Sequence, residues 1–108
     1  MKKRHDLMSQ LILLRHDPEL AQTLRAEALK GNTDAQYGTG LIYAEGRGVD
    51  QDAVEAYAWL SVAMLQGDPD AETLRDAVMQ TLSLEQIRAA MERAGSYVAS
   101  IERGNARH

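Results

Sequence analysis

The sequence predicts an all-α fold built from short helices that pack as antiparallel neighbours. Ala, Leu, Glu, Gln and Arg recur along the whole chain of 108 residues, and their intrinsic propensities favour helix. No segment shows the sustained alternation of apolar and polar residues that is typical of strands. A short motif at residues 31–36 also returns at residues 67–72, and such self-similarity is typical of helical repeats.

The repeated motif predicts two junctions between helices. Each copy begins with Gly31 or Gly67, and glycine commonly ends a helix in the left-handed conformation. Asn32 or Asp68 follows, and these residue types are favoured caps of the next helix. The two junctions lie 36 residues apart. They therefore bracket one structural unit and mark the start of a second copy.

Upstream of the first junction, the sequence predicts a helix from Pro18 to Lys30. Asp17 precedes Pro18, and an Asp-Pro pair is typical of a cap followed by the first helical position. The expected apolar side consists of Leu20, Leu24 and Leu29. Residues 6–15 are expected to form either a further short helix or a partly mobile segment.

Between the junctions, the sequence predicts a helical hairpin. The first helix runs from about Asn32 to Glu45 and the second from about Gln51 to Gln66. Residues 46–50 contain two glycines around one arginine, a combination that is costly inside a helix but suits a tight turn. The second helix has an apolar face at helical spacing, which consists of Ala56, Trp59, Leu60 and Ala63.

Two further helices are expected after the second junction. Asp68 would cap one that runs from Pro69 to Gln80. Ser83 and Gln86 have the spacing of a capping box, in which the side chain of each residue accepts a hydrogen bond from the backbone N–H of the other. The long helix that follows is expected to end near Gly104. Its apolar positions step by three and four residues: Ile87, Ala90, Met91, Ala94, Val98 and Ile101.

Composition limits the domain count and the classes of partner. The chain has the size of one ordinary domain, and its loops are too short to be linkers. The formal net charge of −4 is mild and argues against nucleic-acid binding, which needs a basic face. No apolar stretch approaches the roughly 20 residues that cross a bilayer, and the basic N-terminus lacks the pattern of a signal peptide. We therefore expect a cytoplasmic protein with no membrane partner.

The sequence gives no indication of catalysis, a metal or a cofactor. Cysteine is absent, and the histidines stand alone at His5, His16 and His108. His5 and His16 are about three helical turns apart, too far to share a metal ion. The serines lack the context of an activated nucleophile, and the Gly-Arg-Gly turn lacks the strand and the Lys-Ser/Thr signature of a phosphate-binding loop. We therefore expect no enzyme activity.

The segment from Gly31 to Asp52 resembles the first half of a Sel1-like repeat, and the match continues through Ala56, Trp59, Ala63 and Gly67. The family pattern combines Ala, Leu-Gly, Tyr, Gly-x-Gly-Val, Asp, Ala, Trp, Ala and Gly at characteristic spacings. The best repeat spans residues 31–66, and residues 67–104 look like a degenerate second repeat with a capping helix. Thr39 departs from the pattern, which usually has Leu there, and its hydroxyl is expected to bond a carbonyl one turn back.

This resemblance implies a single domain, residues 1–108, that forms a short right-handed α-solenoid of antiparallel helix hairpins with a C-terminal capping helix. The related tetratricopeptide pattern implies a groove with an apolar centre and an acidic edge on the first helix of each pair. The candidate binding residues are Asp34, Tyr37, Leu41, Glu45, Asp70 and Thr73. Such a groove suits a protein or peptide partner with Lys or Arg at its margin, so the expected role is that of an adaptor, regulator or inhibitor.

Two alternatives remain open from the sequence. Tyr37 and Leu41 could instead pack against the preceding helix around Leu24 and Leu29, as apolar positions of an amphipathic helix usually do. The chain could also be an architectural module that docks with itself or with a larger helical complex. That homo-oligomer would use residues 11–14 or the outer side of the last helix.

Overall fold

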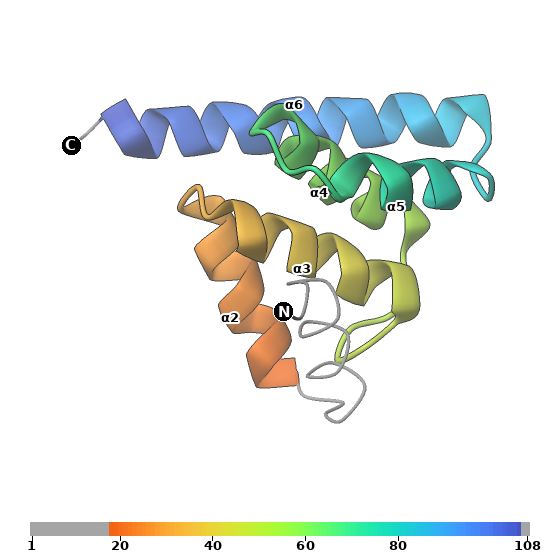
Figure 1. Ribbon diagram of the computed structural model, residues 1–108, viewed down its shortest axis with the longest axis horizontal. Coiled ribbons are helices and arrows are strands. Elements are labelled where there is room, and N and C mark those ends of the chain that lie inside the picture. Colours follow the sequence, from red (N-terminus) through yellow and green to blue (C-terminus); the bar gives the residue numbers. More distant parts are fainter. Residues whose placement is uncertain (1–17, 107–108) are drawn as a thin grey trace.

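The computed structural model describes residues 18–106, and those residues form five α-helices and no strand (Figure 1). The all-α prediction is therefore confirmed for this part of the chain. The helices are α2 (Pro18–Leu29), α3 (Thr33–Glu45), α4 (Ala53–Leu65), α5 (Ala71–Met79) and α6 (Leu84–Ala106). The expected segment at residues 6–15 lies outside the described residues.

Capping residues set the starts of α3 and α6 where the sequence predicts them, whereas α5 begins at Ala71, two residues after the expected start at Pro69. The Asn32 side chain accepts from the N–H of Ala35 at 2.9 Å, and Asp68 accepts from the N–H of Ala71 at 3.2 Å. The capping box forms, since the N–H of Gln86 donates to the Ser83 hydroxyl and the N–H of Ser83 donates to the Gln86 side chain. The expected stop at Gly104 is wrong, because α6 continues to Ala106.

Helices α3 and α4 form the predicted hairpin. Gly46 ends α3 in the left-handed conformation, with φ of 70°, and Asp52 caps α4 by accepting from the N–H of Glu55. The two helices approach closely at Gly40, where an added Cβ would lie 2.7 Å from Cγ of Leu60. A larger residue at position 40 would therefore push the helices apart.

Helix α4 is the centre of the fold, since α3, α5 and α6 all pack against it. Every residue from Glu55 to Ala63 is buried. Trp59 is fully buried and stacks on Tyr97 of α6, with ring centroids 4.2 Å apart. Helix α6 packs across α4 and touches α5 only slightly. The last two helices therefore do not form a closely packed hairpin of their own.

The face of α6 that meets α4 is apolar and small. Ala90 and Ala94 are buried there, and Ile101 lies beside Gly31 at the turn between α2 and α3. The opposite face is exposed and mostly polar: it comprises Glu85, Arg88, Ala89, Glu92, Ser96, Ser100 and Arg103. A helix with this division of residues covers the apolar side of α4 and presents a polar surface outward. Among the described residues, no helix is both long and apolar enough to span a membrane.

Candidate functional site

The structure places the two apolar candidate residues of α3 in the core. Tyr37 is 1% exposed and Leu41 is 3% exposed, so neither can form the centre of an open groove, and that expectation is corrected. The physical reason is that α2 and α4 both pack on α3, which leaves it buried from Ala35 to Ile42. Leu24 of α2 packs against this core, as the alternative interpretation predicts, whereas Leu29 is 37% exposed.

The polar candidate residues lie at the surface but are spread along it. Asp34 is exposed in the first turn of α3, and Glu45 is exposed at its last residue, about 16 Å further along the helix. Glu45 pairs with Arg47 at 3.6 Å. Asp70 is half-buried before α5, and Thr73 is exposed on α5. Both acids of α3 therefore flank the buried residues without joining them in one groove.

A shallow depression of about 200 Å³ lies beside the end of α5. Its lining is mostly apolar and comes from Ala44, Gln51, Ala53, Ala77, Val78 and Thr81. Thr73, Ala77 and Thr81 follow one another at intervals of four residues, so they share one side of α5 and its end. The depression therefore lies along the same side of α5 as the candidate residue Thr73.

Several carboxylates adjoin this depression in the sequence. Glu45 follows Ala44, and Asp50 and Asp52 flank Gln51. Asp76 precedes Ala77 and pairs with Arg75 at 3.4 Å, with an Asp76 side chain that is 51% exposed. Asp52 instead lies 3.9 Å from Arg93 of α6. The segments that line the depression therefore carry three other acids and two arginines, Arg47 and Arg75, and this balance favours a partner with positive charge.

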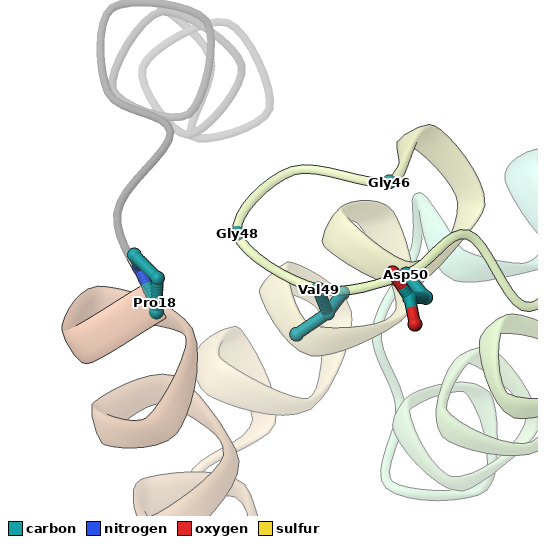
Figure 2. Close-up of a pocket in the computed structure, with 5 residues that line it drawn as sticks. All are labelled: Pro18, Gly46, Gly48, Val49 and Asp50. Atoms are coloured by element: carbon teal, nitrogen blue, oxygen red, sulfur yellow. The ribbon is translucent and has the colours of Figure 1, made fainter.

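A second depression, of about 410 Å³, opens between the start of α2 and the turn that joins α3 to α4 (Figure 2). Pro18 lies on one side, and Gly46, Gly48, Val49 and Asp50 lie on the other. Asp50 is the one titratable side chain among these described lining residues. The lining therefore offers little chemistry for a specific ligand.

A polar cluster that sequence reasoning missed lies where α2, α3, α4 and α6 meet. At its centre, the Glu55 side chain is only 9% exposed. The Tyr97 hydroxyl donates to it at 2.7 Å, and Nη1 of Arg93 donates at 3.0 Å. Arg25 approaches the same carboxylate to 3.8 Å and donates to the Tyr43 hydroxyl at 2.8 Å. We call these five residues the Glu55 cluster.

The cluster shifts the titration of its own members. Burial raises the pKa of Tyr97 to about 12, and the hydrogen bond to Glu55 adds to the rise. Burial alone would lower the pKa of Arg25, but the contact with Tyr43 and the charge of Glu55 leave that pKa above its usual value. Tyr97 is therefore neutral and Arg25 is charged at physiological pH.

One sequence signal could have pointed to this cluster. Glu55 is the single charged residue of α4, in a run of apolar and small residues from Ala53 to Leu65. A carboxylate on such a helix needs charged or hydrogen-bonding partners when it is buried. The sequence could not identify them, because Arg93 and Tyr97 lie 38 and 42 residues further along the chain.

The described residues contain no group of three or more His, Asp or Glu side chains that could hold a metal ion. The three histidines considered in the sequence, His5, His16 and His108, lie outside the part of the chain that the structure describes. The described residues that line the two depressions are mostly small or apolar.

Comparison with known proteins gives a distant, partial similarity. Over 61 residues, the chain is 34% identical to alginate biosynthesis protein AlgK of Azotobacter vinelandii. The match covers 56% of this chain but only 13% of AlgK, so the chain corresponds to a small part of that protein. No family model and no solved structure matches the chain.

Proposed function

We propose that this chain is a helical-repeat module that binds a protein partner and catalyses no reaction. The partner segment lies along α5 and over the turn between α3 and α4, and it places one aliphatic side chain in the depression beside Ala77. Lys or Arg residues of the partner face the acids of the segments that line the depression. The partner segment extends from Glu45 on one side of the depression to Thr73 on the other.

The observation that carries this proposal is the apolar depression, together with the acids in the chain segments that line it. An apolar anchor in a pocket supplies binding energy, and charged groups at the rim supply orientation and specificity. A depression of about 200 Å³ has room for one aliphatic side chain. Because Tyr37 and Leu41 are buried, the anchor site lies at Ala77 and Val78 and not at the middle of α3.

The similarity to AlgK supports a repeat-type module. A match of 61 residues within a much longer protein is what a shared structural unit produces. Helical-repeat units stack into extended surfaces, and such surfaces commonly bind proteins. The similarity does not identify the partner, since it covers 13% of AlgK.

A peptide-display experiment tests the proposal. Random twelve-residue peptides are selected on the full chain, and their binding is then measured on an Ala77→Arg variant. The selected peptides are expected to contain one aliphatic residue with Lys or Arg nearby. Ala77→Arg fills the depression and adds a like charge, so it should weaken binding by about tenfold or more.

The matched control is Ala89→Arg, which adds the same side chain at an exposed position of α6. Its peptide affinity should stay within about twofold of the parent, as expected for a surface change away from the site. If both variants lose binding equally, or if the selected peptides show no basic or aliphatic preference, the depression is not the binding site.

The alternative, docking of this chain with itself, has less support from the described residues. The outward face of α6 is mostly polar, and the exposed Leu84 and Met91 are separated by about two helical turns. Self-docking surfaces are usually apolar and contiguous. A mass that rises with concentration in sedimentation equilibrium would favour this alternative over the adaptor role.

A further inference from the structure

We infer that the Glu55 cluster is a second binding site, at which Arg25 and Arg93 hold a carboxylate of an acidic protein segment. It is independent of the proposed function, because it uses different residues and partner groups of opposite charge. The inference rests on how the two guanidinium groups are held and on which of their donors remain unused.

The carboxylate of Glu55 holds the guanidinium groups of Arg25 and Arg93 in place. This carboxylate accepts from Tyr97 through both oxygens, at 2.7 and 2.8 Å. Arg93 donates to one of these oxygens at 3.0 Å, and Arg25 lies 3.8 Å from the other. The carboxylate is 9% exposed, so water competes little for it. The side chains of Arg25 on α2 and Arg93 on α6 therefore converge on the same carboxylate of α4.

The contacts of both arginines with the protein use only one nitrogen each. Nη1 of Arg25 contacts Tyr43 and Glu55, and Nη1 of Arg93 contacts Glu55 and lies 3.9 Å from Asp52. Within the described residues, Nη2 and Nε of both groups have no hydrogen-bond or ion-pair partner. The side chains are 43% and 46% exposed, so these donors are accessible from solvent.

Such an arrangement suits a carboxylate. The planar guanidinium group matches a carboxylate through two parallel N–H···O bonds. Glu55, Tyr43 and Tyr97 already hold the two side chains in place. Binding of a ligand therefore costs little of the side-chain conformational entropy that ordering them would otherwise require. Because Glu55 and Asp52 balance the two positive charges, the site selects a ligand through the geometry of the unused donors.

The cluster also differs from an ordinary apolar core contact. Burying a carboxylate with its partners is often no better for stability than packing apolar residues of similar size. The rest of α4 is apolar or small, so an aliphatic residue at position 55 would fit the helix pattern. Binding gives a reason for a charged group here that stability alone does not.

The test uses the full chain and a blocked tetraglutamate peptide, with tetraglutamine as the neutral control. NMR spectra report the side-chain Nε–H resonances of the arginines during titration. Tetraglutamate is expected to shift Arg25 and Arg93, and tetraglutamine is not. The affinity should fall as salt is added, because the contacts are charged and partly exposed.

Three variants give the decisive comparison. Arg93→Gln removes one donor group and should weaken the affinity by about fivefold or more, as loss of a charge-assisted contact does. Arg88→Gln removes the same charge from an exposed position of α6 and should stay within about twofold. Glu55→Gln removes a negative charge that repels the ligand carboxylate, while its amide oxygen can still accept hydrogen bonds, so the affinity should rise by about threefold. Circular dichroism verifies that each variant is folded.

Each result separates a binding site from a purely structural cluster. If Arg88→Gln weakens binding as much as Arg93→Gln, the attraction is general and the site is wrong. If Glu55→Gln fails to tighten binding, the ligand carboxylate does not lie beside Glu55, and the proposed site is wrong. Saturable binding of trigalacturonate without binding of tetraglutamate would overturn the assignment to an acidic protein segment. None of these outcomes depends on peptide binding at Ala77.

Discussion

The absence of a single methyl group at Gly40 sets the distance between α3 and α4. An alanine there would place its Cβ 2.7 Å from Cγ and 2.8 Å from Cδ2 of Leu60, which is fully buried. The branched end of a buried leucine has little room to turn away. The backbone must shift, or the leucine must adopt a strained rotamer.

Gly40→Ala should therefore lower the free energy of unfolding. Overpacking of this kind costs about 1–3 kcal/mol, and this exceeds the gain of about 1 kcal/mol in helix propensity. Gly95→Ala is the matched control, because nothing lies within 4 Å of its added Cβ. That variant should be more stable than the parent, and urea denaturation measures both. A stabilised Gly40→Ala variant would contradict the close approach.

Tyr97 gives a prediction for alkaline pH. Its pKa is about 12 in the folded protein and about 10 in an unfolded chain. Since the folded state holds the phenolic proton more tightly, this contribution to stability is complete below pH 10 and is lost as the pH rises to about 12. Urea denaturation between pH 8 and about 12 should show the loss. Tyr97→Phe should flatten that part of the profile, and an unchanged profile would contradict the role of Tyr97.

At the scale of the helices, the boundaries that local chemistry controls could be predicted from the sequence. Asn32, Asp68 and the pair Ser83 and Gln86 each bond a backbone group within three residues, so their roles need no tertiary information. Thr39 likewise donates to the carbonyl of Ala35, one turn back, at 2.7 Å. Gly104 does not end α6, because glycine weakens a helix without necessarily ending it.

The candidate site was harder to predict than the helices. Whether Tyr37 and Leu41 are exposed depends on which helices cover α3, and a periodic pattern does not identify the covering helix. The Glu55 cluster joins residues from four helices, and its pairs are far apart in the sequence. Only the unusual charge on α4 was visible in the sequence alone.

The capping box of α6 provides a test at this scale. Ser83→Ala removes the hydroxyl that accepts from the N–H of Gln86 at 3.1 Å, so it should lower the free energy of unfolding by about 1 kcal/mol. Ser96→Ala is the control, since Ser96 is an exposed residue within the same helix, and it should be neutral or slightly stabilising. Equal effects of the two changes on thermal unfolding would show that the cap contributes nothing.

For the whole molecule, the central position of α4 makes the helices depend on one another. Helices α3, α5 and α6 each cover a different part of α4, and α2 covers α3. Helices α5 and α6 pack mainly on α4, and α2 packs mainly on α3, so each of them depends on the α3–α4 hairpin. An arrangement of this kind favours cooperative unfolding of the described part of the chain.

Calorimetry tests this cooperativity. The calorimetric and van't Hoff enthalpies of unfolding should agree, as they do for a two-state domain. Ile101→Ala, at the contact between α6 and the turn after α2, should lower the melting temperature while keeping a single transition. A separate early transition in either protein would show that α6 unfolds independently of the rest.

The lone tryptophan of the sequence is also a natural reporter for α6. Trp59 has no exposed surface, and one face of its indole lies against the Tyr97 ring at an angle of 8°. Indole emission moves to longer wavelength on contact with water, and an adjacent phenol alters its intensity. The unmodified protein therefore carries an optical signal for any event that lifts α6 from α4. No dye or label has to be attached to follow that motion in real time.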